Sequence, residues 1–371
     1  MKTVRRLLYA DVVTSVVFVA AAFLSLFFFI DFVDELGDLG KGYSALYAAL
    51  YSLLELPAHL YELSPIAVLI GTIYALSRLA QSSEFTILRT GGLGPGRALS
   101  LLMGLGLAFG VFTFVIGDYV APLSERAAAG LHAGFKGGLG LGRTGAWLKD
   151  RRTTSEGERF YSINVGGAQA NGELRNIRIF EFDNANALVR RISATRGHVG
   201  ADSTWMLADV QVTDWHAAST ASDSPMKIDV QKLPSLAWSS SLPAGVVAAA
   251  VLPEGSLSTF ELFRYIAHLA DNEQAAQRYE IKFWKRALYP LACLVMVGLA
   301  LPFAYLHARA GGVSLKVFGG IMLGISFVLL NNVAAHLGLL HNWTPWLVAA
   351  TPSLLYLLLS LAAFSWLVRY R

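Results

Sequence analysis

Residues 12–30 read VVTSVVFVAAAFLSLFFFI and contain no Asp, Glu, Lys or Arg. A helix needs roughly 20 apolar residues to cross the hydrocarbon core of a bilayer, and this run of 19 nearly meets that length. No Ala-x-Ala cleavage site follows it before the acidic segment that begins at Asp31. We therefore interpret it as a retained membrane span rather than a cleaved signal peptide.

Further apolar stretches have the same character. The chain has 371 residues, of which 54% are hydrophobic and only 15% charged, whereas soluble domains carry about 25% charged residues. The second span is less clean, because Glu62 precedes its apolar run and a lead-in from Leu56 is needed for sufficient length. We predict six spans in all, the other five at about 56–77, 98–117, 288–306, 317–335 and 343–368.

The basic residues near the span ends set the orientation. With a cytoplasmic N-terminus, the cytoplasmic segments carry ten basic residues against the two acids Asp11 and Glu84. The segment after the first span is acidic instead. Lys and Arg concentrate on the cytoplasmic side of membrane proteins, so both termini are predicted to be cytoplasmic. The ten are Lys2, Arg5, Arg6, Arg78, Arg89, Arg97, Arg309, Lys316, Arg369 and Arg371.

The segment at about 43–56 has an amphipathic pattern. Tyr43, Tyr47 and Tyr51 recur at every fourth position, beside a row of leucines. This pattern predicts an interfacial helix on the outer leaflet. A helix packed against the bundle explains it equally well.

No span is predicted between the third and fourth, where residues 122–255 have the texture of a β domain. Short β-rich runs alternate there with Gly, Asn and Asp clusters, a pattern typical of a sandwich, jelly roll or open roll. The orientation places this domain outside the cytoplasm. The predicted strands are 159–165, 177–182, 190–195, 204–215 and 226–230.

A helical connector is predicted after the β domain, in the segment 256–371 that also holds the last three spans. Ser258 and Glu261 have the spacing of a capping box, in which each residue bonds the other's backbone. A second helix, beginning near Asn272, is predicted to continue into the fourth span.

The cytoplasmic segment between spans two and three predicts a short helix at about 83–91. Ser82 or Ser83 is a suitable N-cap, Glu84 suits the first turn, and Gly91-Gly92 ends the helix. A short helix parallel to the membrane is suited to docking a partner. The alternative is a simple connector whose Glu84 only satisfies the helix N-terminus.

Several kinds of site are not predicted. The chain has no Gly-x4-Gly-Lys-Ser/Thr sequence, so we expect no ATP hydrolysis through a P-loop of its own. Cys293, the one cysteine, lies in an apolar run and is interpreted as a core residue. Neither His132 nor His198 has metal-ligand spacing, and no Gly-x-Ser-x-Gly motif is present. We predict no metal site and no enzyme activity.

Four motifs in register resemble the permease subunits of the lipopolysaccharide exporter, the LptF/LptG family. The first runs from Pro65-Ile-Ala-Val-Leu-Ile-Gly-Thr through Leu79-Ala-Gln-Ser-Ser-Glu84 to Arg89-Thr-Gly-Gly. The resemblance covers essentially the whole chain, and the remaining motifs favour the LptG branch. These are Phe32-Val-Asp-Glu-Leu36, Gly117-Asp-Tyr-Val-Ala-Pro122 and Gly145-Ala-Trp-Leu-Lys-Asp150.

The resemblance implies an ABC exporter that extracts lipopolysaccharide from the outer leaflet of the inner membrane of a Gram-negative bacterium. It implies an LptF-like partner, two copies of an LptB-like ATPase that bind ATP and Mg, and an LptC-like single-span protein. Membrane lipid would surround the spans, and no nucleic acid is expected. The β domain would be a periplasmic jelly roll that passes the lipid to a bridge.

The resemblance also implies roles for single residues. Glu84 matches the coupling-helix glutamate, which an arginine of the ATPase would meet, with Ser83, Phe85 and Arg89 beside it. Spans one and five would form lateral gates that face lipid. Their expected residues are Phe27, Phe28, Asp31, Gly319, Gly320 and Gly324.

One position departs from the family. Family members carry a lysine for lipid A phosphate where this chain has Asp31, and an acidic group repels phosphate. We therefore expect phosphate contact elsewhere, for example at Lys41, and interpret Asp31 as a solvated interfacial charge.

Two other classes of function remain open. An ion-coupled secondary transporter would usually place ionisable residues at mid-membrane, yet five of the spans lack Asp, Glu, Lys and Arg. A sensor or scaffold with an outer β domain would signal through the segment around Glu84.

Overall fold

The computed structural model describes most of the chain. The described residues are 2–37, 39–40, 43–82, 84–136, 139–140, 145–154, 157–169, 172–200, 202–216, 227–251, 254–271, 276–305 and 312–370. They divide into two compact units. The helical unit comprises Met1–Gly37, Ser52–Pro122 and Gln277–Arg371, and the β unit comprises Asp38–Tyr51 and Leu123–Ala276. The β unit is therefore wider than the predicted 122–255.

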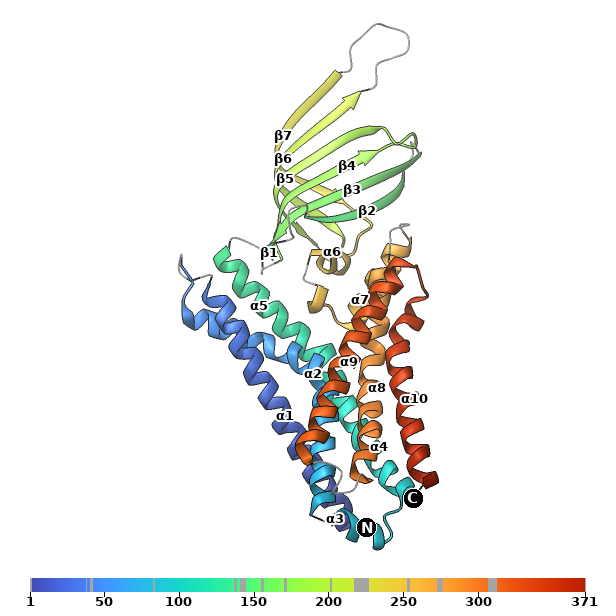
Figure 1. Cartoon of the computed structure of the whole chain (residues 1–371). Coiled ribbons are helices and arrows are strands. Elements are labelled where there is room, and N and C mark those ends of the chain that lie inside the picture. The colour runs from blue at the N-terminus through green and yellow to red at the C-terminus, as the bar shows by residue number, and fades with distance from the viewer. Residues whose placement is uncertain are drawn as a thin grey trace. The chain divides into compact units, whose positions relative to one another are not determined.

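Six helices among the described residues are long and apolar enough to cross a membrane, as the sequence predicts. The third is α4, which continues without a break through a π-helical turn, η1 (Ile116–Val120), into α5 (Ala121–Lys136). Figure 1 shows them in colours that run from blue for α1 to red for α10. Their bounds are α1 Lys2–Leu36, α2 Ala45–Gln81, α4 Pro95–Val115, α8 Gln277–Tyr305, α9 Val313–Leu340 and α10 Pro345–Tyr370.

The core of the helical unit forms where these helices meet. Helix α8 packs against both α4 and α10, and the side chains of Cys293, Met296 and Val297 on α8 are fully buried. The interpretation of Cys293 as a core residue is confirmed. Of the six candidate spans, α2 is the most buried and α1 the least.

The predicted separate helix at about 43–56 is wrong as a separate element. This segment is the first part of α2, which runs on to Gln81 through Pro57 and Pro65. Prolines are tolerated inside membrane helices because neighbouring groups satisfy the freed backbone acceptors. Its aromatic row packs on α5: the Tyr47 ring lies 4.6 Å from Phe135, and the Tyr51 ring 5.0 Å from His132.

The third span also extends further than predicted, because Pro122 does not end it. The N–H of Ala121 donates to Ile116 O, five residues back, which is the hydrogen-bond pattern of a π-helix. Proline has no N–H to offer and usually breaks a helix. Here it falls directly after a turn where the bonding pattern has already shifted, and α5 continues to Lys136.

The β unit contains a seven-stranded antiparallel sheet in which β2 through β7 each pair with the next strand along the chain. The two-residue β1 pairs with the end of β3. A jelly roll requires strands that cross between two sheets, and the described strands show no such crossover, so the open roll is the better description. The strands are β1 Leu139–Gly140, β2 Ala146–Thr154, β3 Gly157–Ala168, β4 Leu174–Phe182, β5 Leu188–Val199, β6 Thr204–His216 and β7 Lys227–Ser239.

One face of this sheet forms the core of the β unit. A row of directly paired residues crosses it from β2 to β6, and those on β2 to β5 are almost completely buried. Asn176 and Asp209 adopt left-handed backbone conformations with φ of 51° and 55°. Each reverses the alternation of side chains between the two faces of the sheet at that point in β4 or β6. Leu174 and Leu207 are therefore buried on the core face as well. The row is Leu148, Ile163, Ile179, Ile192 and Val212.

The sheet curls until β2 and β3 reach β7. The guanidinium of Arg152 on β2 lies 4.3 Å from the Tyr161 ring centre and 4.5 Å from that of Trp238 on β7. Asp150, which is 1% exposed, accepts hydrogen bonds from the Ser240 hydroxyl at 3.0 Å and from the Ser241 N–H at 3.2 Å. These contacts tie the first long strand to the end of the last.

Two helices and a short 3-10 turn follow the sheet: α6 (Ala244–Val251), η2 (Glu254–Ser256) and α7 (Thr259–Asp271). The predicted capping box at the start of α7 is confirmed. The Ser258 N–H donates to Glu261 Oε2 at 2.8 Å, and the Glu261 N–H donates to Ser258 Oγ at 3.2 Å. The predicted start of the next helix near Asn272 lies outside the described residues, and α8 continues into the fourth span as expected.

Candidate functional site

The segment between α2 and α4 contains one short helix, α3 (Glu84–Thr90), at the position where the sequence predicts one. Two glycines end it as predicted. The Leu93 N–H donates to Leu88 O, five residues back, and Gly92 takes a left-handed conformation with φ of 97°. This is the hydrogen-bonded stop that a glycine after a helix provides, and it turns the chain into α4.

Phe85 fixes α3 to the rest of the helical unit. Its side chain is 4% exposed, and its ring meets Tyr305 at the end of α8 edge to face, with 5.1 Å between ring centres. It belongs to the same buried cluster as Leu79 and Leu93. Phe85 is therefore an anchor of α3 within this chain rather than part of its outer face.

The outer face of α3 carries Glu84 and Ile87. Glu84 is exposed, and the described part of the chain shows no ion pair or hydrogen bond to its carboxylate. The Ile87 side chain is 67% exposed, although its apolar character groups it with Phe85 in the sequence. Ser83 and the side chain of Arg89 lie outside the described structure.

Two arginines brace the segments on either side of α3. Arg78, near the end of α2, pairs with Asp11 of α1 at 2.8 Å. Arg97, at the start of α4, donates to Gly92 O at 3.2 Å. The helix is thus held by its neighbours, while Glu84 and Ile87 on the described part of its outer face stay exposed.

At the opposite end of α2, Asp31 of α1 is paired. Its Oδ2 lies 2.8 Å from Nε2 of His59 on α2, and each of these two side chains is 22% exposed. The Phe27 ring packs on the same histidine, with 4.7 Å between ring centres. The interpretation of Asp31 as a solvated charge is therefore wrong, because His59 supplies a partner that spacing along the chain does not reveal.

The three glycines predicted for a gate in span five differ in position. A Cβ on Gly320 would lie 2.7 Å from Ile73 Cδ1, and one on Gly324 would lie 2.8 Å from Ile66 Cγ2, whereas a Cβ on Gly319 would meet nothing within 4 Å. Gly320 and Gly324 therefore let α9 approach α2 closely, as small residues do between membrane helices. They face α2 rather than lipid.

Helix α1 leaves much of its apolar surface uncovered. Phe18 and Phe29 are 72% and 62% exposed, and Phe28 stacks only on Phe32 of the same helix among the ring contacts described. Close contact with α2 occurs at Val16, whose Cα would lie 2.6 Å from a Cβ on Gly71. Exposed apolar surface of this extent requires lipid or a partner. Lys41, the expected headgroup contact, lies outside the described residues.

Two features of these sites do not follow from the sequence pattern: the position of His59 beside Asp31 and the outward facing of Ile87. His59 is a single histidine in an apolar helix and carries no motif. Ile87 follows the apolar pattern of α3 and differs from Phe85 only in facing outward. In the described part of the chain, no group of three His, Cys, Asp or Glu side chains gathers at a position suited to a metal ion.

The amino-acid sequence of the chain is similar to that of known proteins along most of its length. Residues 6–367 match the model of the family described as lipopolysaccharide export system permease LptF/LptG. The chain is 28% identical over 352 residues to lipopolysaccharide export system permease protein LptG of Escherichia coli strain K12, covering 94% of each chain. It is 27% identical over 343 residues to the protein of that name in Haemophilus influenzae, covering 89% of each. The chain is a membrane protein that belongs to the LptF/LptG family of lipopolysaccharide export system permeases.

Proposed function

We propose that this chain is a permease subunit of an ATP-driven lipopolysaccharide exporter. It would extract the glycolipid from the outer leaflet of the inner membrane and pass it to a periplasmic bridge. The observation that carries this proposal is α3, a short helix anchored by a buried Phe85 that presents Glu84 without a partner in the described structure. A rigid helix with an exposed carboxylate is suited to docking by a separate ATPase subunit.

The proposed partners follow from the surfaces that the chain leaves open. An LptF-like permease and an LptC-like single-span protein would cover exposed apolar parts of α1, α9 and α10. Two copies of an LptB-like ATPase would bind ATP and Mg, because this chain has no P-loop sequence. An arginine of one ATPase copy would meet Glu84.

The proposed orientation follows from the positive-inside pattern of the sequence. Both termini and α3 would be cytoplasmic, in the inner membrane of a Gram-negative bacterium. The β unit would be periplasmic and would receive the lipid. Lys41 remains the proposed headgroup contact.

Coupling would proceed through packed contacts. Movement of α3 by the ATPase would reach α2 through the chain and α8 through the contact between Phe85 and Tyr305, because close-packed interiors transmit displacement. Helix α1, the least buried span, would move most easily and open or close a lateral gate. Asp31, paired with His59, would tie this gate to α2 rather than bind phosphate.

The test replaces the exposed carboxylate and leaves the anchor intact. Glu84→Ala, purified with its partner subunits, should recruit the ATPase at least about tenfold more weakly or uncouple hydrolysis from lipid release, because truncating one side of an interfacial charge pair leaves the other unpaired. Thr90→Ala on the same helix is the matched control and should behave as wild type. Normal ATPase recruitment and lipid release by Glu84→Ala would exclude the assignment.

A further inference from the structure

The face of the β sheet opposite to its buried row forms the outside of the curl. Figure 1 shows β2 to β7 as one curved sheet. The contacts that close it lie on the core face, and successive side chains of a strand alternate between the two faces. One row of paired residues on the outer face runs from Lys149 of β2 through Phe180 and Arg191 to Val230 of β7.

A second row of the outer face lies two residues along the strands. It runs from Trp147 of β2 through Arg178 of β4 to Lys232 of β7. Arg178 and Arg191 are diagonal neighbours on the paired strands β4 and β5, so they lie about 7–8 Å apart on one face. The Trp147 ring stacks beside that of Phe180, with 6.1 Å between ring centres. We call these two rows together the outer rows.

The outer rows are positively charged. They lie wholly within the described residues and contain four basic side chains and no acidic one. None of the four has an acidic partner in the described part of the chain. The Nε atom of Arg191 is also buried and lacks a hydrogen-bond acceptor there, and an unsatisfied buried donor is costly. The four are Lys149, Arg178, Arg191 and Lys232.

Exposed apolar side chains lie among these charges. Trp147 is 51% and Val230 49% exposed. Ile228, two residues before Val230 on the same face, is 55% exposed. Clustered exposed apolar groups mark protein interaction sites, and aromatic and arginine side chains are enriched in protein interfaces. A protein surface that carries both carboxylates and apolar groups matches this composition.

The size and shape of the outer face also suit a protein partner. Six strands about 4.8 Å apart make it about 24 Å wide, and its shortest strands, with nine residues, are about 30 Å long. The product, about 700 Å², approaches the roughly 800 Å² that each partner buries in a standard interface.

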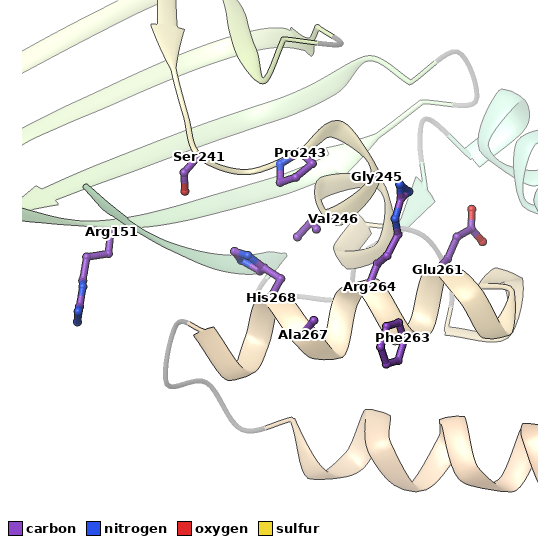
Figure 2. Close-up of a pocket in the computed structure, with 10 residues that line it drawn as sticks. All are labelled: Arg151, Ser241, Pro243, Gly245, Val246, Glu261, Phe263, Arg264, Ala267 and His268. Atoms are coloured by element: carbon purple, nitrogen blue, oxygen red, sulfur yellow. The ribbon is translucent and has the colours of Figure 1, made fainter. Parts of the chain in front are cut away.

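Small-molecule sites are concave instead. The β unit has such a pocket of about 570 Å³ between β2, α6 and α7, which Figure 2 shows. None of the described residues that line it belongs to the outer rows. The outer rows are therefore a separate, open surface.

We propose that the outer rows are a docking surface for the acidic face of a partner protein. Carboxylates of the partner would meet Arg178 and Arg191, because a guanidinium binds a carboxylate through two parallel hydrogen bonds. Trp147 and Val230 would pack on apolar side chains of the partner. An anionic glycan or lipid would neutralise the same cations but would leave Ile228 and Val230 uncovered. The surface lies wholly within the β unit and does not depend on coupling at α3.

The experiment uses the full chain, expressed in bacterial cells with its partner subunits. The photo-crosslinking residue benzoylphenylalanine replaces Ser193, which pairs with Arg178 in the second outer row. The control places it at Asn184, an exposed residue of the turn between β4 and β5. Mass spectrometry identifies the adducts that form on irradiation. An adduct with a protein of net negative charge is expected from position 193 and not from position 184.

Charge reversal tests whether the outer rows cause this capture. Arg178→Glu should lower the yield of the protein adduct at least about tenfold, because it sets a carboxylate against the carboxylates of the partner. Arg178→Lys should retain most of the yield. Arg264→Glu is the matched control: Arg264 is exposed on α7 and lines the pocket of Figure 2, so it changes the net charge equally and should leave the yield unchanged.

ATPase recruitment should be unchanged in all three variants, which separates this surface from the proposed function. The proposal would be overturned by the absence of an adduct specific to position 193, by adducts with lipid or glycan alone, or by an equal protein yield in Arg178→Glu. The melting temperature checks that Arg178→Glu is folded. Lys232→Glu reverses a second exposed charge in the same row and should cause the same loss.

Discussion

Asp31 and Glu84 are two acidic side chains at opposite ends of the helical unit, and their surroundings are opposite as well. Asp31 is half-buried and lies 2.8 Å from His59, whereas Glu84 is exposed with no partner in the described part of the chain. About 22 residues of α2, roughly 33 Å of helix, separate His59 from the end next to α3. The first carboxylate holds two helices of one chain together, and the second is available to another molecule.

A similar division applies to the two apolar side chains of α3. Phe85 is buried against Tyr305, and Ile87, two residues later, points outward. A seven-residue helix is too short to be stable alone in water, so the buried residue must supply its stability. The contrast between inward anchors and outward groups can be tested by substitution.

The largest effect is expected for Phe85→Ala. Removing a fully buried phenylalanine typically costs about 3–5 kcal/mol, from lost transfer energy and the remaining cavity. The melting temperature of the full chain in detergent should fall clearly. Ile87→Ala is the matched control and should change stability by no more than about 0.5 kcal/mol. Equal effects of the two would mean that α3 is not anchored through Phe85.

The second-largest effect on stability is expected at the close contact between Val16 of α1 and Gly71 of α2, which lies between Asp31 and Glu84 along the helical unit. A Cβ on Gly71 would lie 2.6 Å from the Val16 backbone, so Gly71→Ala must push α1 and α2 apart. Overpacking of this kind costs about 1–3 kcal/mol. Thermal unfolding of the full chain would report it.

Gly319→Ala provides the control for Gly71→Ala. Its added Cβ would meet nothing within 4 Å, and alanine is favoured over glycine in helices by about 0.5–1 kcal/mol. The control should therefore be neutral or slightly stabilising. A loss of stability at Gly319 as large as that at Gly71 would contradict the helix contacts described.

A smaller effect is expected for the contact between Asp31 and His59. A double-mutant cycle with Asp31→Ala and His59→Ala should give a coupling of about 0.5–1.5 kcal/mol, the usual net value of one partly exposed hydrogen bond. Chemical unfolding of the four proteins measures it. A coupling near zero would show that Asp31 is a solvated charge after all.

The sequence predicted the features that depend on local composition. Six spans follow from apolar length, and the end of α3 follows from Gly91-Gly92, because glycine alone takes the required backbone conformation cheaply. The capping box at Ser258 is equally local. Family motifs, rather than physical pattern, singled out Glu84.

Features that depend on distant partners were missed. Strand β2 was not predicted, because its Lys-Asp-Arg-Arg run resembles a solvated loop. In the fold, Asp150 is bonded by serines after β7, and Arg152 lies against Trp238, nearly 90 residues away. The pairing of Asp31 with His59 and the inward facing of Gly320 depend on helix packing in the same way.

The smallest effect on stability, and the most informative one, is expected for Glu84→Gln. The side chain keeps its shape and loses its charge, and it is exposed with no partner in the described structure. Substitutions at such surface positions usually change stability by less than about 0.5 kcal/mol. The melting temperature of the isolated chain should therefore match that of wild type.

Association with the proposed ATPase should nevertheless weaken, because an arginine facing a neutral amide loses its charge partner. Thr90→Ala, on the same helix, should alter neither quantity. A lowered melting temperature for Glu84→Gln would mean that Glu84 stabilises its own chain as Asp31 does, and the contrast between the two carboxylates would disappear. Unchanged stability together with weakened association would establish that the Glu84 carboxylate binds a partner protein and does not stabilise its own chain.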